Sequence, residues 1–374
     1  MSETVYPISK VVAPRIHSYF RYLSENCNQR PAAPIPGVPA IEAIIEAGFW
    51  ASLRRDEGYI PKISLAWIGP SQVEHPLSFA EPIHLDPIAL TFVSAAVERP
   101  GIHLGVWHNG EGFEVWGVVQ ALPAYCFVLE VIGPGLLAVK QSGGPFDKFA
   151  NVAVLEGNQV KVVDQSAAIL QAAPAALAAL VRIDSASTEA GNPSIVLQIA
   201  ISMRRHQRGG TLLVIPAGCE SWRHSILQPM KYSVTPPFDQ LRQFVHRADD
   251  PRPPKQDDEI RRSVDAIAGL TAIDGATVIT NQYELLVFGA KIIRSTGSPI
   301  VERVILTESV EQAESQAVHP NQLGGTRHLA AAQFVQDQRD ALALVASQDG
   351  RFTIFAWSEG EDAVHAHRIE TLLL

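Results

Sequence analysis

The sequence predicts an α/β protein of the α+β type, with a mainly β N-terminal domain and a C-terminal domain whose helices flank a mixed sheet. Three observations predict this division. Short apolar runs broken by Gly, Pro or Asn fill residues 63–163, as is typical of strands. After residue 194, runs of helical spacing alternate with short strand-like runs. The length of 374 residues allows two or three domains, and a hydrophobic content of 47% can form their cores.

The N-terminal domain is placed at residues 1–183. Prolines between residues 31 and 39 predict an extended connector, because proline fixes φ and has no backbone donor. Apolar residues at helical spacing predict a helix over 41–55. The predicted strands are Ile63–Ile68, Leu104–Trp107, Phe113–Val119, Cys126–Val131 and Leu136–Val139. Alanine-rich Ala167–Leu180 predicts a helix, and the small polar residues Asp184–Pro193 predict a linker.

The C-terminal domain is placed at residues 194–374. A helix over 195–205 is predicted to end at Gly209–Gly210, before a buried strand at Thr211–Ile215. The charged, proline-rich residues 249–259 predict a loop, and a helix is expected over 260–270. Two hairpins are predicted, Thr277–Thr280 with Glu284–Phe288 and Leu342–Ala346 with Phe352–Trp357.

Charge and composition narrow the functional classes. A net charge of −9 argues against a nonspecific nucleic-acid-coating protein. Cys27, Cys126 and Cys219 lie far apart, so neither a disulfide framework nor a zinc pair is expected, which fits a reducing cytoplasm. The N-terminus lacks the pattern of a signal peptide, and no apolar stretch reaches the roughly 20 residues of a membrane span. We therefore expect a cytoplasmic protein without membrane contact.

Three short segments carry the candidate chemistry. Asp274–Ala276 (Asp-Gly-Ala) precedes a strand, and its carboxylate suits Mg²⁺ or Mn²⁺, which favour oxygen ligands. Gly324–His328 (Gly-Gly-Thr-Arg-His) precedes a helix-like run at 329–335, where an N-cap threonine and free amides would form an anion site. Ser347–Asp349 adds a hydroxyl and a second carboxylate. Each segment alone is more often an ordinary turn or helix cap, but their combination is more specific.

Residues from about Ser194 onward resemble the diadenylate cyclase domain. Asp274–Ala276 matches that family's Asp-Gly-Ala motif, and residues 325–328 match its Gly-Thr-Arg-His-Arg motif, except that Leu329 replaces the final arginine. Gln348 and Asp349 stand where two glutamates are usual, and Ser295–Gln322 is an apparent insertion. The N-terminal half resembles the sensor domain called DACNV, most clearly at Phe49–Glu57.

The resemblance implies that two ATP molecules form cyclic di-AMP and two pyrophosphates in a site made by two self-associating domains. It implies catalytic roles for Asp274, Arg327 and His328, the last in contact with phosphate or metal. Asp274 and Asp349 are the implied ligands of Mg²⁺ or Mn²⁺. The implied nucleotide-binding residues are Gly275, Ala276, Gly324, Gly325, Thr326 and Ser347.

Leu329 and Gln348 leave an alternative open, in which a weak or inactive cyclase-like domain acts as an adenine-nucleotide sensor. Two further alternatives are a cyclase that makes another cyclic dinucleotide, and an interaction protein whose function lies in the N-terminal domain.

Other conspicuous residues have plainer explanations. The basic run 204–208 is expected to complement the dipole at a solvated helix end. His365 and His367 are expected to be surface histidines on one strand face. The four tryptophans of the N-terminal domain, Trp50, Trp67, Trp107 and Trp116, are expected to be core or interface aromatics, with a ligand cage as the lesser alternative.

Overall fold

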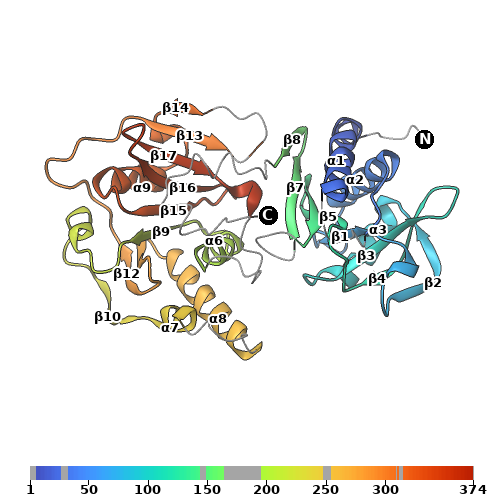
Figure 1. Ribbon diagram of the computed structural model, residues 1–374, viewed down its shortest axis with the longest axis horizontal. Helices are drawn as coiled ribbons and strands as arrows, with labels where there is room; N and C mark the ends of the chain where they lie inside the picture. The colour runs from blue at the N-terminus through green and yellow to red at the C-terminus, as the bar shows by residue number, and fades with distance from the viewer. Residues whose placement is uncertain are drawn as a thin grey trace. The chain divides into compact units, whose positions relative to one another are not determined.

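The computed structural model describes residues 6–26, 33–143, 149–163, 195–246, 254–308, 310 and 315–373. The chain forms two compact units, Met1–Gln165 and Ser166–Leu373 (Figure 1). Each unit contains one mixed sheet with helices, so the predicted α+β class with a β-rich N-terminal region is confirmed. The predicted helix 167–180, the linker 184–193 and the predicted boundary between residues 183 and 194 lie outside the described residues.

The N-terminal unit is built on an eight-stranded sheet of order β2-β4-β3-β1-β5-β6-β7-β8. Its only parallel pair among the described strands is β1 with β3. The strands are β1 (Ile63–Trp67), β2 (Leu77–His84), β3 (His103–His108), β4 (Phe113–Val119), β5 (Phe127–Gly133), β6 (Leu136–Ser142), β7 (Phe149–Glu156) and β8 (Gln159–Val162). All five strands predicted for this unit are confirmed. The sequence patterns did not predict β2, β7 and β8.

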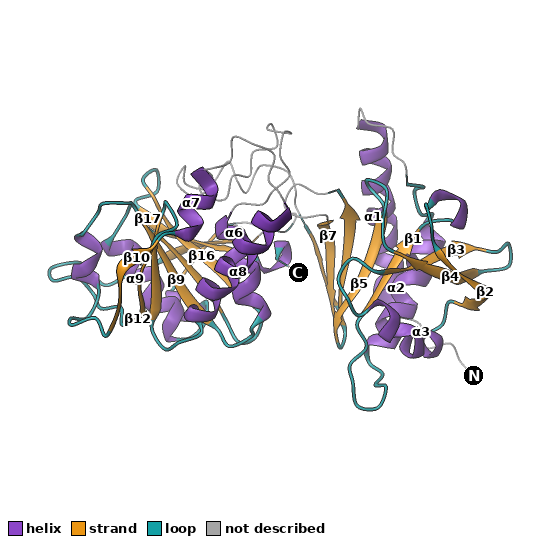
Figure 2. Cartoon of the chain, turned by 90° about the horizontal axis from the view of Figure 1, so that it is seen from below, coloured by secondary structure: helices purple, strands orange, loops and turns teal. Residues whose placement is uncertain are grey.

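Among the described residues of this unit, three α-helices accompany the sheet: α1 (Pro7–Asn26), α2 (Val38–Ser52) and α3 (Pro87–Val93). α2 is the predicted helix 41–55, and it packs beside α1 (Figure 2). Its apolar residues at helical spacing, such as Ile41, Ile44 and Ile45, are fully buried in the core of the unit. The prediction for the tryptophans is also confirmed, because Trp67 and Trp116 are buried while Trp50 and Trp107 pack against the core.

The C-terminal unit is built on a nine-stranded sheet of order β10-β12-β11-β9-β15-β16-β17-β13-β14. Its strands are β9 (Gly210–Ile215), β10 (Tyr232–Phe238), β11 (Ala276–Thr280), β12 (Leu285–Ala290), β13 (Val304–Glu308), β14 (Gln316–Val318), β15 (Leu342–Ala346), β16 (Phe352–Ser358) and β17 (Ala363–Arg368). Both predicted hairpins, β11–β12 and β15–β16, are confirmed as antiparallel pairs. The apparent insertion contributes β13 and β14 at one edge of this sheet.

The helices of this unit are α6 (Ile195–Arg205), α7 (Gln240–His246), α8 (Pro254–Thr271) and α9 (Thr326–Asp337). Side chains alternate across the central strands, so that Leu213 and Val345 join the core beneath α9 while Leu212 and Leu344 face the other way. α6 and α8 contact β15, β9 and β11 without joining that core, and therefore cover the opposite face. The fold is thus a three-layer arrangement with the sheet in the middle.

The predictions for residues 249–259 and for the two histidines of β17 are wrong. The predicted loop 249–259 gives way to α8 from Pro254 onward, because proline is compatible with the first turn, whose amides have no partner within the helix. His365 and His367 are 4% and 2% exposed rather than on the surface. They do lie on one face of β17, opposite to the face from which Val364 and Ala366 join the core beneath α9, and that second face is covered as well.

Burial of His367 predicts a pH dependence of stability. Burial, with the nearby His365, lowers the pKa of His367 from 6.5 to about 4, and Thr307 Oγ1 lies 2.5 Å from its Nδ1. Between these two pH values the unfolded chain binds a proton that the folded chain does not, so the free energy of unfolding falls as the pH falls from 6.5 to about 4. This pKa difference of His367 contributes at most about 3 kcal/mol to the free energy of unfolding.

We expect the urea midpoint of the protein to fall between pH 7 and pH 4.5, and His367→Gln to reduce the fall. The matched control is His75→Gln, which changes an exposed histidine of the other unit. An identical pH dependence in wild type and His367→Gln would show that His367 does not carry the effect.

Within the part of the chain that the structure describes, no helix is both long enough and apolar enough to span a bilayer.

Candidate functional site

The three motif segments lie at the same end of the C-terminal sheet. β11 runs parallel to β9 with Ala276 opposite Thr211, so Asp274 precedes β11 at the level where Gly209 precedes β9. β15 runs antiparallel to β9 on its other side, with Ala346 opposite Gly210, so Ser347–Asp349 follows at that end. Because neighbouring strands lie about 4.8 Å apart, one strand spacing separates Gly209 from Asp274 and another separates it from Ser347.

Gly209 is where Arg327 meets the sheet. A Cβ placed on Gly209 would lie 2.8 Å from Arg327 Nη1, 3.2 Å from the Ala346 carbonyl oxygen and 3.4 Å from Gln348 Cγ. The absence of a side chain here lets the guanidinium from the start of α9 approach the ends of β9 and β15. Gly209 also has a φ of +71°, which glycine adopts readily. Asp274, Arg327 and the Ser347–Asp349 turn are thereby brought to one region.

The start of α9 differs from the prediction in one respect. Gly325, not Thr326, is the N-cap residue, and Thr326 is the first residue of the helix. As far as the described chain shows, no side chain caps the first turn, and the His328 amide donates to the Gly325 carbonyl oxygen at 3.0 Å. The amides of Thr326 and Arg327 are therefore the donors left for an anion. Thr326 is exposed and Arg327 is partly exposed, so a hydroxyl and a guanidinium accompany those amides.

His328 has a different environment from its neighbours in the motif. It is 2% exposed, its ring packs over Gly324, and the ring centroid lies 6.1 Å from that of Phe355. Burial, with the positive charge of Arg368 and other arginines, lowers the pKa of His328 to about 4, so the ring is neutral at pH 7. Its Nε2 is buried without a hydrogen-bond partner among the described residues. His328 therefore anchors the start of α9 and is not a cation at neutral pH.

The glycine after Asp274 is required by a close backbone contact. Gly275 has a φ of +108°, and a Cβ placed on it would lie 2.5 Å from the carbonyl carbon of Gly289 in β12. Gly289 in turn lies under Tyr232, whose ring stacks on Phe288 with centroids 5.0 Å apart and planes 4° apart. Asp274 is itself exposed, and a half-exposed aromatic pair lies beside it.

The Ser347–Asp349 turn supplies the second carboxylate. Partial burial alone would raise the pKa of Asp349, but hydrogen bonds involving Ser347 and Arg351, with the Arg351 charge, outweigh it and hold the pKa below its ordinary value. Asp349 is therefore ionised at neutral pH. Gln348 donates through Nε2 to the Arg208 carbonyl oxygen at 3.4 Å. Leu329, at the position of the missing arginine, packs against the apolar core beneath α9.

The structure adds residues that the motif analysis missed. The pair Gly209–Gly210 is visible in the sequence, but its pattern predicts only the end of a helix and not a contact with Arg327. Arg204, assigned to a solvated helix end, instead donates to the carbonyl oxygens of Gly350 and Leu373, and burial lowers its pKa. Tyr232 carries no sequence signal, because its position beside Asp274 depends on the pairing of β10 with β12.

The side chains around the candidate site decide how the implied Mg²⁺ or Mn²⁺ could be held. Over the described residues, no group of three or more His, Cys, Asp or Glu side chains is placed to hold a metal ion. Mg²⁺ is usually held by one or two carboxylates together with substrate phosphates and water. Asp274 and Asp349 are exposed carboxylates at this end of the sheet, and either could hold a cation that arrives with a nucleotide. They do not resemble a closed structural metal site.

Comparison with known families identifies the N-terminal region. Residues 30–120, from the connector before α2 to the end of β4, match the family model described as "Probable sensor domain DACNV". This confirms the resemblance seen in the sequence for that part of the chain, including Phe49–Glu57. A search of curated proteins found no match to the sequence.

Proposed function

We propose that the C-terminal domain is a diadenylate cyclase, which condenses two ATP molecules into cyclic di-AMP and releases pyrophosphate under the control of the N-terminal sensor domain. The observation that carries the proposal is the meeting of Asp274, the uncapped start of α9 with Arg327, and Asp349 around Gly209. A hydroxyl-activating carboxylate, an anion-binding helix start and a second carboxylate are the parts that phosphoryl transfer to a hydroxyl requires.

The proposed chemistry follows from where these groups lie. The 3′-oxygen of one ATP forms a bond to the α-phosphorus of the other, and the bond from that phosphorus to the bridging oxygen of pyrophosphate breaks. Asp274 accepts the proton of the 3′-hydroxyl. Arg327, Thr326 and the free amides of α9 hold the phosphate oxygens and stabilise the charge that develops on them. Mg²⁺ or Mn²⁺, held by Asp274 and Asp349, would neutralise phosphate charge.

Two further residues complete this proposal. His328 is neutral and buried, so we assign it the positioning of the α9 start rather than contact with phosphate. Tyr232, stacked on Phe288 and half exposed beside Asp274, offers an aromatic face for the adenine base. Because each domain binds one ATP, the reaction needs self-association that places two such sites face to face.

Leu329 favours a second candidate function, an adenine-nucleotide sensor with weak or no turnover. Its side chain lies against the apolar core, so it supplies no charge to phosphate. Loss of one cation lowers transition-state stabilisation more than ground-state binding, because charge on the phosphoryl oxygens develops during the reaction.

One experiment separates the two functions. Purified full-length protein is incubated with ATP and either Mg²⁺ or Mn²⁺, and the products are identified by mass spectrometry while ATP binding is measured by calorimetry. We expect a product with the mass of cyclic di-AMP. Saturable ATP binding without product would select the sensor, and neither binding nor product with either metal would overturn both.

A further inference from the structure

Arg204 joins three separate parts of the C-terminal unit. It lies in the last turn of α6, next to Met203, which is fully buried. Its Nε donates to the Gly350 carbonyl oxygen and its Nη1 donates to the Leu373 carbonyl oxygen, each at 3.2 Å. A planar guanidinium presents its donors in a fixed fork, so one side chain can hold two carbonyl groups at once. Arg204 thereby ties α6 to the turn after β15 and to the chain beyond β17.

The turn that Arg204 holds carries Asp349. Within this turn the Ser347 amide donates to the Arg351 carbonyl oxygen at 2.9 Å, and the Gly350 amide donates to the Ser347 carbonyl oxygen at 3.2 Å. The same turn orients the Asp349 carboxylate, because the Arg351 amide donates to its Oδ1 at 3.4 Å and Arg351 Nε lies 3.5 Å from its Oδ2. Whatever fixes the turn therefore fixes the direction of that carboxylate.

A second attachment of the turn is weaker. Gln348 Nε2 donates to the Arg208 carbonyl oxygen at 3.4 Å, and both groups are exposed, so water competes for this bond. The two bonds of Arg204 are shorter and partly buried. Arg204 is therefore the stronger of the two links between this turn and the end of α6.

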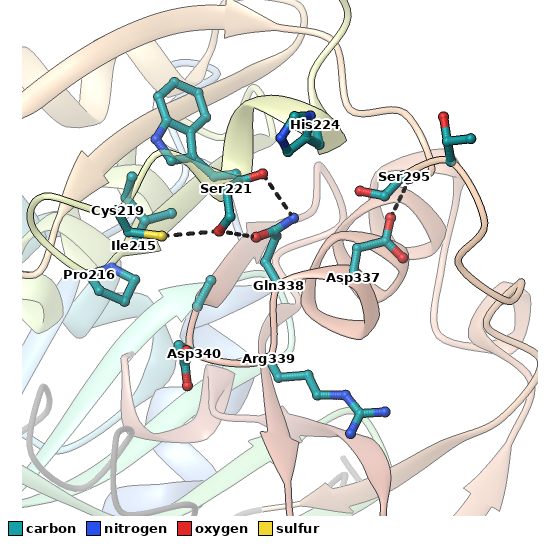
Figure 3. Close-up of a pocket in the computed structure, with 13 residues that line it drawn as sticks. Ile215, Pro216, Cys219, Ser221, His224, Ser295, Asp337, Gln338, Arg339 and Asp340 are labelled. Carbon is teal, nitrogen blue, oxygen red and sulfur yellow. Dashed lines mark hydrogen bonds between the residues drawn. The ribbon is translucent and has the colours of Figure 1, made fainter.

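The other end of β15 is held independently. Ser221 Oγ donates to Gln338 Oε1 at 2.8 Å, at one wall of a pocket (Figure 3). Gln338 Nε2 donates to Ser225 Oγ at 2.9 Å, and the Ala341 amide, just before β15, donates to the Gln338 carbonyl oxygen at 2.9 Å. Loss of the Arg204 fork should therefore loosen the turn at one end of β15 without displacing the strand.

We propose that Arg204 is a positioning residue, which holds the turn after β15 so that the Asp349 carboxylate can bind a divalent cation. Two of its three guanidinium nitrogens donate to backbone carbonyl groups, so Arg204 acts through Asp349 and not by contact with phosphate. This inference rests on the proposed function, because it takes Asp349 as a ligand of the cation that accompanies ATP.

The first measurement is amide hydrogen exchange of the full-length protein, which needs neither nucleotide nor activity. Arg204→Lys keeps the positive charge but replaces the planar fork by a single ammonium nitrogen. We expect the peptide over 347–351 to exchange roughly fivefold faster, the change that one net hydrogen bond produces. The peptide over 276–280 in β11 should exchange at the wild-type rate. The matched control Arg205→Lys changes an exposed arginine of the same helical turn and should leave both peptides unchanged.

The second measurement tests whether Arg204 acts through Asp349. ATP binding to the full-length protein is followed by calorimetry at a series of MnCl₂ concentrations, which requires no turnover. Arg204→Lys should raise the half-saturating Mn²⁺ concentration roughly fivefold. In an Asp349→Asn background the same substitution should change it less than about twofold, because the carboxylate that Arg204 positions is absent.

Three results would each overturn the inference: unchanged exchange over 347–351 in Arg204→Lys, equally accelerated exchange in β11, or an effect on Mn²⁺ dependence that persists in full in the Asp349→Asn background. Wild-type Mn²⁺ dependence in Arg204→Lys would overturn this inference alone and leave the proposed function intact. A wild-type protein that binds no ATP would overturn both.

Discussion

Replacement of Asp274 by asparagine is expected to lower cyclic di-AMP formation at least about a hundredfold, the lower end of what a general base contributes. Asparagine has nearly the shape of aspartate but cannot accept the proton of a hydroxyl or carry the charge that a cation requires. Asp274 is exposed and precedes β11, so the substitution leaves the sheet intact. The measurement is product formed from ATP over time, with thermal unfolding as the check on the fold.

The matched control is Asp258→Asn, which removes an exposed carboxylate from α8 without touching the candidate site. It is expected to keep full activity. Should Asp274→Asn retain activity comparable to the control, the proton acceptor would be a different group. An active wild type would then keep the cyclase proposal while removing Asp274 from its central role.

Replacement of Gly275 by alanine is expected to destabilise the C-terminal unit by about 2–5 kcal/mol. A Cβ there meets the Gly289 carbonyl carbon at 2.5 Å, and a backbone atom cannot rotate aside as a side chain does. The φ of +108° adds strain for any residue with a Cβ. β11 and β12 would have to separate, so the loss should appear as a lower midpoint of urea unfolding.

Gly297→Ala separates the two causes. Gly297 also has a positive φ, +82°, but a Cβ there would meet no atom within 4 Å. Gly297→Ala should therefore lower the free energy of unfolding only by the backbone strain, about 1 kcal/mol. If Gly275→Ala and Gly297→Ala were equally destabilising, the contact with Gly289 would not be the reason for glycine after Asp274, and the Asp-Gly pair would have to be explained by ligand access alone.

The secondary structure around the candidate site could be predicted because local rules determine it. Thr211–Ile215 and Leu342–Ala346 are apolar runs because both faces of their sheet are covered. Each run therefore predicts a strand even when the neighbouring strands are not known. The three motif segments were placed correctly at element ends for the same reason. The N-cap was misassigned by one residue because glycine and threonine both favour that position.

The histidines show where local rules fail. The alternation of His365 and His367 indicated a strand, and β17 is one. Whether a strand face is exposed depends on what covers it, and polar side chains favour the surface only on average. His328 likewise reads as a phosphate ligand in its motif, but its helix turns it toward Phe355 and the core.

By itself, the sequence determined the two-part α+β organisation and the order of the three motif segments, because composition, periodicity and turn chemistry act over short stretches of chain. The similarity of the N-terminal region to DACNV rests on a family resemblance, which the sequence also carries. Only the tertiary structure decided that Asp274, Arg327 and Asp349 meet around Gly209. Those juxtapositions depend on strand order and register, which residues distant in the sequence set together.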